Sequence, residues 1–262
     1  MEQKGCRPNV VSYNTIIDGL CEATLIGEAL KLFAEMTRSD LDPNVVTYTC
    51  LIQGLCDIGR WKQATRLLDG MLSKGILPNL HTFSVLVNTH SREGMVMEAK
   101  SVVQMMIQSG IEPDTITYSS LMDCYCFRGE MDEAKKVFDL MVRKGCMVNV
   151  HSCSILINGY CKSRKVDQAH NIFKEMTCWE LVPNTVTFNT LINGFYKAGR
   201  IEEAEKLLSD MQRGGQLPDV RTYAVTLDGM CNNQQLSAAL ELLREMEGKK
   251  LELNRVCSRY VL

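Results

Sequence analysis

All six prolines of this chain lie on a single repeating lattice. They are Pro8, Pro43, Pro78, Pro113, Pro183 and Pro218, so the intervals between them are 35, 35, 35, 70 and 35 residues. Proline fixes its own φ angle and has no amide hydrogen to donate, so it marks turns and helix ends. A turn at multiples of 35 residues indicates that one small structural unit is repeated along the chain. Folds without such repeats are excluded.

The repeating frame contains seven uninterrupted copies of 35 residues. We begin each copy two residues after the proline position, which gives copies at 10–44, 45–79, 80–114, 115–149, 150–184, 185–219 and 220–254. Alanine then occupies the twentieth place of every copy and methionine the twenty-seventh. Residues 1–9 are expected to be the end of a preceding copy, and residues 255–262 the start of a truncated one. Neither end carries a polar capping unit, so we expect a segment of a longer array or a truncated gene product.

Each copy is predicted to form two helices joined by a turn. In copy 185–219 the first apolar stripe has the spacing of one helix face and consists of Phe188, Leu191, Ile192 and Phe195. Gly199 interrupts the pattern, a second stripe of helical period runs from Ile201 to Met211, and Pro218 closes the unit. One hairpin cannot bury both stripes, so neighbouring copies must stack into an all-α solenoid.

Composition excludes several classes of function. Of the 262 residues, 45% are hydrophobic and 23% charged, which argues against a disordered chain. No stretch approaches the roughly 18 consecutive apolar residues of a membrane span, so we expect no membrane partner. The N-terminal residues have the features of neither a signal nor a transit peptide. The formal net charge is −2, so bulk positive charge cannot hold nucleic acid.

The cysteines and histidines do not form the motifs of metal or redox chemistry. Five cysteines occupy the twelfth place of their copies: Cys21, Cys56, Cys126, Cys161 and Cys231. Equivalent places in stacked neighbours lie too far apart for a disulfide, so we predict small buried side chains in a reducing compartment. No C-x-x-C, H-x-E, H-E-x-x-H, P-loop or G-x-G-x-x-G motif occurs. We therefore expect no metal, no cofactor and no catalytic activity.

The copies resemble a known repeat family. First helices begin with Val45-Val46-Thr47-Tyr48-Thr49 or Thr185-Val186-Thr187-Phe188-Asn189, and copies end with motifs such as Gly75-Ile76-Leu77-Pro78-Asn79. These motifs resemble the pentatricopeptide repeat (PPR) family over essentially the whole chain, and the period is one residue longer than the tetratricopeptide period. The constant length of 35 resembles its P subfamily. The many Asn-Gly and Cys residues of the first helices resemble its plant fertility-restorer branch.

The resemblance implies a fold and a function. It implies a right-handed superhelix of helical hairpins that binds single-stranded RNA, one base per repeat. It also implies action on organellar transcripts, in their processing, stability, splicing or translation. The organelle is expected to be the mitochondrion, with the chloroplast as the alternative. RNA-processing proteins are expected as further partners of a monomeric chain.

Two places of the frame vary among a few small, mostly polar residue types, and the resemblance identifies them as base-reading positions. The fifth places are Asn14, Thr49, Ser84, Ser119, Ser154, Asn189 and Ala224. The thirty-fifth places are Asn44, Asn79, Asp114, Asn149, Asn184, Asp219 and Asn254. On the residues alone, these side chains could instead cap helices and build turns. Ser or Thr at the third place of every copy supplies a cap candidate, which leaves the fifth place for base reading.

The family's recognition rule can be applied copy by copy. Thr49 with Asn79, Ser119 with Asn149, and Ser154 with Asn184 resemble adenine-reading pairs. Ser84 with Asp114 resembles a guanine pair, Asn189 with Asp219 a uracil pair, and Asn14 with Asn44 a pair that accepts a pyrimidine. Ala224 with Asn254 has lost one polar partner and is expected to be permissive. The predicted RNA site is 5′-pyrimidine-A-G-A-A-U-any-3′.

Two further places are predicted to contact RNA without reading it. The second place is expected to clamp bases and holds Val11, Val46, His81, Ile116, His151, Val186 and Arg221. His81, His151 and Arg221 depart from the aliphatic pattern, but each can stack on a base or pair with phosphate. Candidate phosphate contacts near the ends of first helices are Arg92, Lys162 and Lys197. Ordinary solvated charge explains these three equally well.

The alternative function is a protein-interaction scaffold of the tetratricopeptide type. Such a scaffold would hold a peptide on the same concave face of the solenoid. The slightly acidic net charge favours this alternative. The small set of residue types at the fifth and thirty-fifth places favours RNA binding, because peptide binding would not require such a restriction.

Overall fold

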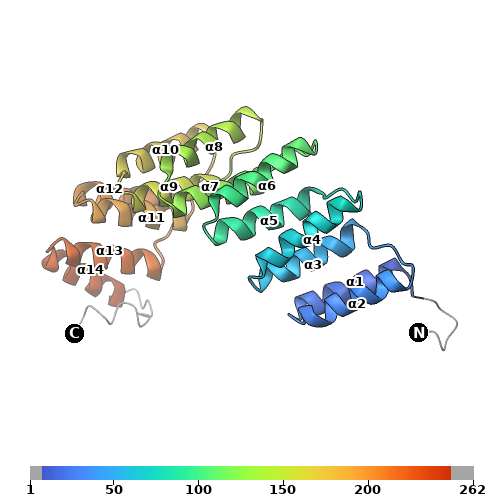
Figure 1. Cartoon of the computed structure of the whole chain (residues 1–262). Helices are drawn as coiled ribbons and strands as arrows, with labels where there is room; N and C mark the ends of the chain where they lie inside the picture. The colour runs from blue at the N-terminus through green and yellow to red at the C-terminus, as the bar shows by residue number, and fades with distance from the viewer. Residues whose placement is uncertain (1–7, 249–262) are drawn as a thin grey trace. The chain divides into compact units, whose positions relative to one another are not determined.

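The computed structural model describes residues 8–248, and within them all regular secondary structure is helical (Figure 1). Every helix has 13 residues. The first helices of the copies are α1 (Val10–Glu22), α3 (Val45–Asp57), α5 (Leu80–Arg92), α7 (Thr115–Phe127), α9 (Val150–Lys162), α11 (Thr185–Lys197) and α13 (Val220–Asn232). The second helices are α2 (Ile26–Arg38), α4 (Trp61–Ser73), α6 (Val96–Gln108), α8 (Met131–Arg143), α10 (Val166–Cys178), α12 (Ile201–Arg213) and α14 (Leu236–Gly248).

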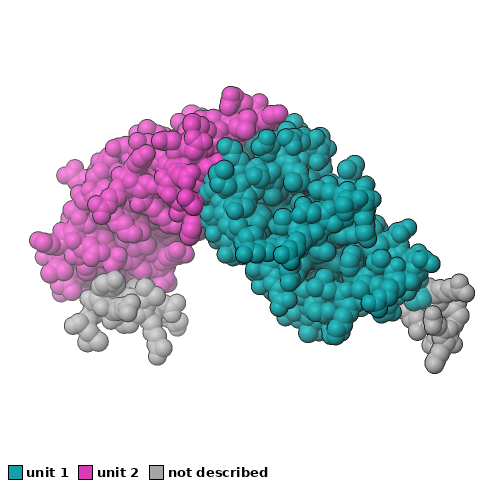
Figure 2. Space-filling model, viewed as in Figure 1, with its two compact units in different colours: residues 1–124 teal, residues 125–262 magenta. Residues whose placement is uncertain are grey.

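The chain divides into two compact units, residues 1–124 and residues 125–262 (Figure 2). In unit 1, α3 packs against α1 and α5 and also against its own partner α4. In unit 2, α11 packs in the same way against α9, α13 and α12. The second helices α2, α4, α8 and α10 each contact the first helix of the following copy as well. Each unit is therefore a stack of hairpins with a layer of first helices and a layer of second helices, which is the predicted α-solenoid arrangement.

The core of each unit comes from the places that hold one residue type throughout. The alanine at the twentieth place and the methionine at the twenty-seventh are buried in all seven copies. Tyr48, Phe83 and Phe188 at the fourth place are buried as well. Burying a side chain of this size contributes roughly 1.5–3 kcal/mol relative to leaving it exposed. The methionines thus pack in the core and form no exposed binding stripe.

The first helices are capped by the thirty-fifth place and not by the third. Asn44 is the N-cap of α3, and its side chain accepts hydrogen bonds from the backbone amides of Val46 and Thr47. Asn79 caps α5 in the same way. The third-place Thr47 and Thr82 occupy the N3 position and return a bond to the backbone of the cap, which completes a capping box. The predicted third-place cap is therefore wrong, because the first helices begin three residues earlier than such a cap requires.

Glycine allows neighbouring first helices to approach closely. A Cβ built on Gly194 of α11 would lie 2.5 Å from Sγ of Cys161 in α9, and one on Gly54 of α3 would lie 2.8 Å from Sγ of Cys21 in α1. No side chain larger than hydrogen fits at these two positions without movement. The tenth place of one copy and the twelfth place of the preceding copy thus interlock.

The in-phase cysteines are only partly buried. Cys21 and Cys56 are buried free thiols, and burial raises the pKa of each to about 11. Cys126, Cys161 and Cys231 are half-buried, so the prediction of burial is wrong for these three. All five cysteines are the last residue but one of a first helix, and the cover that this end of the helix receives differs between copies. Burial still raises the pKa of Cys161 to about 12.

No helix of the described residues has the length and apolarity that a membrane crossing requires.

Candidate nucleic-acid interface

Five first helices, α3, α5, α7, α11 and α13, begin beside a set of three polar side chains from two neighbouring copies. The set comprises the fifth and thirty-fifth places of one copy and the third place of the next copy, and we call it the polar triad. The thirty-fifth place caps the next helix, and the third-place hydroxyl bonds to that cap. In four of the five sets the fifth place bonds to the same hydroxyl. The triad thus joins the two predicted base-reading residues of one copy through a third residue.

Three triads have a hydroxyl at the fifth place. The oxygen–oxygen distances are 2.7 and 2.9 Å in Thr49–Thr82–Asn79, 2.9 and 2.7 Å in Ser84–Thr117–Asp114, and 2.9 and 2.9 Å in Ser154–Thr187–Asn184. The third-place hydroxyls of all three are fully buried. Because a hydroxyl both donates and accepts, the third-place hydroxyl can donate to the cap oxygen and still accept from the fifth-place hydroxyl. Each fifth-place hydroxyl also lies 2.7–2.8 Å from the backbone carbonyl oxygen of the first residue of its own helix.

Two triads have asparagine at the fifth place, and there the two predicted readers touch directly. Nδ2 of Asn14 donates to Oδ1 of Asn44 at 3.2 Å, while the hydroxyl of Thr47 donates to Oδ1 of Asn14 at 2.6 Å. Nδ2 of Asn189 lies 3.5 Å from Oδ1 of Asp219. The longer amide therefore fills space that a serine or threonine leaves open.

Two of the predicted pairs are not brought together in this way. Ser119 is a buried residue of unit 1, and Asn149 caps α9 in unit 2. Ala224 is half-buried and has no polar side-chain atom. Asn254 lies outside the described residues.

Capping determines which atom of the thirty-fifth place is left for a ligand. The backbone amide of Thr82 donates to Asn79 at 2.9 Å, and that of Thr222 donates to Asp219 at 2.7 Å. A backbone amide can only donate, so the atom that it meets must be an oxygen. The remaining atom is Nδ2 in asparagine, a donor, and Oδ2 in aspartate, an acceptor. Asn79 and Asp219 are exposed, so this second atom can be reached.

Asp219 is held in its ionised form. Burial alone would raise the pKa of its carboxyl group, but hydrogen bonds from the backbone and side chain of Thr222 and from Asn189 outweigh this effect. The pKa of Asp219 is therefore lower than its ordinary value. At neutral pH its second oxygen can only accept.

Acidic first-turn residues are distributed unevenly between the two layers of helices. None of the first helices has an acidic residue in its first turn. Five of the second helices have at least one there: α2, α6, α8, α10 and α12. The second helices α4 and α14 share this absence. At α7 and α13 the carboxylates of Asp114 and Asp219 meet the helix N-terminus, so within the first-helix layer the dipole is left without a nearby carboxylate only at the helices that begin after asparagine.

The second places are exposed beside the triads. Val11, Ile116, Val186 and Val46 are 69%, 67%, 55% and 48% exposed. His81, His151 and Arg221 are exposed as well. Exposed β-branched side chains at one place of the frame form an apolar surface available to a flat ligand.

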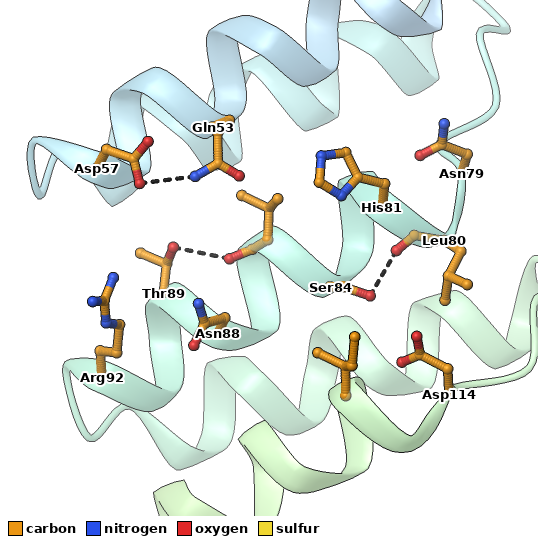
Figure 3. Close-up of a pocket in the computed structure, with 12 residues that line it drawn as sticks. Gln53, Asp57, Asn79, Leu80, His81, Ser84, Asn88, Thr89, Arg92 and Asp114 are labelled. Atoms are coloured by element: carbon orange, nitrogen blue, oxygen red, sulfur yellow. Dashed lines mark hydrogen bonds between the residues drawn. The ribbon is translucent and has the colours of Figure 1, made fainter. Parts of the chain in front are cut away.

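A cavity of about 570 Å³ brings several predicted residues together in unit 1 (Figure 3). The triad members Ser84 and Asp114 line it, as do the second-place residues His81 and Ile116. Arg92, a predicted phosphate contact, lines the cavity too. One cavity thus has two triad members, two clamp candidates and a cation on its walls, together with the carboxylate of Asp57.

The three predicted phosphate contacts are all exposed final residues of first helices. Arg92 ends α5, Lys162 ends α9 and Lys197 ends α11. A cation at a helix C-terminus also complements the dipole. Their positions are therefore compatible with a phosphate contact and with a purely stabilising role.

Sequence reasoning missed two amides that line this cavity. Gln53 of α3 and Asn88 of α5 both occupy the ninth place of their copies. The signal was present, because the ninth place carries a carboxylate or an amide in every copy.

No group of three or more His, Cys, Asp or Glu side chains suited to a metal ion occurs among residues 8–248.

The fold and this surface define an α-solenoid of 35-residue helical hairpins with a polar triad between successive copies. The PPR repeat family matches the chain at residues 8–57, 43–92, 86–126, 113–162, 148–197 and 183–232, and a further PPR repeat matches residues 221–251. The chain therefore belongs to the PPR repeat family.

Individual relatives agree with this assignment. A pentatricopeptide repeat-containing protein of Arabidopsis thaliana is 48% identical over 42 residues, which are 16% of this chain and 8% of the relative. The crystal structure of the pentatricopeptide repeat protein PPR10 from maize covers 95% of this chain at 29% identity, with a TM-score of 0.74. This chain covers 36% of that structure. It thus spans well under half of either relative.

Two further structures contain RNA. PPR10 in complex with an 18-nt psaJ RNA element has a TM-score of 0.63 and 25% identity, and the match covers 99% of this chain and 43% of PPR10. The PPR domain of Arabidopsis thaliana protein-only RNase P 1 in complex with tRNA has a TM-score of 0.59 and 16% identity, over 68% of this chain and 94% of that domain. The second likeness concerns the fold alone.

Proposed function

We propose that this chain binds single-stranded RNA in a sequence-specific manner, with one base read by each 35-residue copy. The polar triad carries the proposal. Its third-place hydroxyl is constant, whereas its fifth and thirty-fifth places vary among a few hydrogen-bonding side chains. A scaffold for peptides has no need of such a constant frame around two variable polar atoms. The RNA-bound structures of PPR10 support the same function.

The thirty-fifth place separates two classes of base. Asparagine presents Nδ2, which can donate to N1 of adenine or N3 of cytosine. Aspartate presents Oδ2, which accepts from N1–H of guanine or N3–H of uracil. Asn79 and Asn184 therefore suit adenine or cytosine, and Asp114 and Asp219 suit guanine or uracil.

The fifth place separates large from small bases. Ser84 and Ser154 leave space beside the triad for a purine, whereas Asn14 and Asn189 fill that space and leave room for a pyrimidine only. Together with the thirty-fifth place, this gives the site 5′-pyrimidine-A-G-A-A-U-any-3′. The exposed second-place side chains stack on the bases, and Arg92, Lys162 and Lys197 contact phosphates.

The biological setting extends the proposal. The constant 35-residue copies support membership of the P subfamily, and the Asn-Gly and Cys content of the first helices supports a fertility-restorer-like member. Such a protein acts on organellar transcripts, in the mitochondrion or alternatively the chloroplast. The chain has no catalytic role of its own. It occupies a transcript segment as a monomer and thereby blocks nucleases or recruits processing proteins.

Binding to defined RNAs tests the proposed function. A labelled RNA with CAGAAUU at its centre is compared by fluorescence anisotropy with an RNA of the same composition in permuted order, at near-physiological salt. Circular dichroism verifies that the protein is helical. We expect at least tenfold tighter binding of the first RNA. Equal affinities would contradict sequence reading. A folded chain that binds neither RNA would favour the protein-interaction alternative.

A further inference from the structure

The ninth place of the frame holds an oxygen acceptor in every copy, and base reading gives it no task. The seven residues are Asp18, Gln53, Asn88, Asp123, Asn158, Asn193 and Asp228. Three are carboxylates and four are amides, so the property they share is a side-chain carbonyl or carboxylate oxygen. All are exposed or half-buried, which excludes a role in the core.

Helix geometry places the ninth residue on the same face as the predicted RNA contacts. The second, fifth, ninth and thirteenth places are separated by three, four and four residues, so their side chains form one stripe. In α5 the stripe consists of His81, Ser84, Asn88 and Arg92, and all four line the 570 Å³ cavity. Figure 3 shows Asn88 between Ser84 and Arg92 along the helix.

This position lies between the base end and the phosphate end of the cavity. Ser84 belongs to the triad and Arg92 is the cation, each about 6 Å from Asn88 along the helix axis. In a nucleotide the part between base and phosphate is the ribose. A carboxylate repels phosphate, so Asp18, Asp123 and Asp228 would oppose any contact to the backbone charge at this place. A hydroxyl donor satisfies carboxylates and amides alike.

The structure also orients one of the amides. Nε2 of Gln53 donates to Oδ1 of Asp57 at 2.8 Å, so its Oε1 is left as the acceptor beside the cavity. Figure 3 shows this bond on the helix that faces Asn88. The orientation is the one that an incoming hydroxyl requires.

We propose that the ninth-place side chains accept a hydrogen bond from the ribose 2′-hydroxyl and so make the chain selective for RNA over single-stranded DNA. The inference rests on the proposed RNA binding and adds a sugar contact to it. The 2′-hydroxyl is the group that distinguishes the two nucleic acids.

Single 2′-deoxy substitutions test this inference. Wild type and Asn88→Ala are titrated with the predicted RNA and with versions that lack one 2′-hydroxyl at a time. Loss of one hydrogen bond predicts that Asn88→Ala lowers affinity for the RNA about three- to tenfold. The variant should also become insensitive to the deoxy substitution at one nucleotide and keep the wild-type response at the others. Asn88→Asp keeps the acceptor and should keep the full pattern of responses.

Gln104→Ala is the matched control, because Gln104 is an exposed amide of α6 that does not line the cavity. It should leave the affinity and all deoxy responses unchanged. If Asn88→Ala weakens RNA and its deoxy versions equally, or changes nothing, the sugar contact is wrong while sequence-specific binding stands. If wild type prefers its site but binds RNA and the corresponding DNA equally, the inference fails in the same way. Absence of any RNA binding would overturn both proposals.

Discussion

At the thirty-fifth place a single side chain combines helix capping with the proposed reading of a base. Oδ1 of Asn79 accepts from the amide and the hydroxyl of Thr82, which caps α5. Its Nδ2 is then the only atom that can face a base. Aspartate accepts the same two bonds in the triads of Asp114 and Asp219. Exchanging asparagine for aspartate at this place therefore keeps the cap. It changes only the second side-chain atom, from a hydrogen-bond donor to an acceptor for the base.

We predict that Asn79→Asp moves the preference at the second nucleotide from adenine to guanine. The fifth-place Thr49 stays, so a purine is retained, and the cap stays, so stability changes by less than about 0.5 kcal/mol. Binding of four RNAs that differ only at that nucleotide, together with urea unfolding, measures both effects. Asn79→Ala is the control, since it loses the preference and also about 1 kcal/mol of stability. An Asn79→Asp protein that still prefers adenine would refute the reading role of this place.

His90 is a buried polar residue whose ring lacks a full set of partners. It is 2% exposed, it lies edge-on to Trp61, and its Nδ1 has no hydrogen-bond partner in the structure. Burial lowers the pKa of His90 below its ordinary value of 6.5. The unfolded chain then binds more protons than the folded one just below pH 6.5. Stability is therefore complete above this pH and decreases as the pH falls.

We predict that His90→Phe, which copies Phe195 of the sixth copy, raises stability by about 1 kcal/mol at pH 7 and by more at pH 5.5. Burial also lowers the pKa of His170, so part of the pH dependence remains in the variant. Urea midpoints at the two pH values provide the measurement. An unchanged difference between the two midpoints would mean that His90 does not contribute.

At the scale of the helices, the sequence was sufficient for the number of helices in each copy and for their pairing into hairpins. Periodic apolar residues and glycine breaks fix these, because every copy repeats the same signal. The cap could not be assigned in advance. Asn79 and Thr82 are both good capping residues three places apart, and only the observed start of α5 at Leu80 decides between them. The triad was not predicted either, because it joins places in two neighbouring copies and depends on which residue caps the helix.

The close approach of first helices gives a prediction at this scale. Gly194→Ala would place a methyl group 2.5 Å from Sγ of Cys161, so α9 and α11 must separate. We expect a loss of about 1–3 kcal/mol, as in other overpacked sites. Gly27→Ala is the matched control in α2, where a Cβ meets nothing within 4 Å, and it should raise stability by up to about 1 kcal/mol. Chemical unfolding of both variants measures the contrast, and equal effects would rule out the interlock.

For the whole molecule, net charge is a poor guide to the face that we propose to bind RNA. The formal charge is −2, yet acidic residues are absent from the first turn of every first helix and present in most second helices. The sequence alone pointed to a weakly acidic scaffold as the alternative, because a sum over residues carries no information on faces. Gln53 and Asn88 were not predicted as cavity residues, because their place in the cavity depends on which face of the helix is exposed.

Salt dependence tests the three cationic contacts together. For single strands each neutralised phosphate contributes about −0.7 to the slope of log Kobs against log salt concentration, so Arg92, Lys162 and Lys197 predict about −2. Arg92→Ala should reduce the magnitude of the slope by about 0.7. Lys100→Ala, an exposed cation of α6, should leave the slope unchanged. Equal slopes in wild type and Arg92→Ala would assign Arg92 to helix stabilisation only.

Selection of bound sequences from a random single-stranded RNA pool is the most direct test of base reading by the triads. One experiment then gives the base preferred by each copy, the alignment of copies with nucleotides and the 5′-to-3′ direction of the RNA along the chain. No RNA has to be chosen beforehand. The account predicts enrichment of pyrimidine-A-G-A-A-U, read 5′ to 3′ from the first copy to the sixth. A folded, helical protein that enriches no sequence, or enriches one unrelated to the triads, would contradict it.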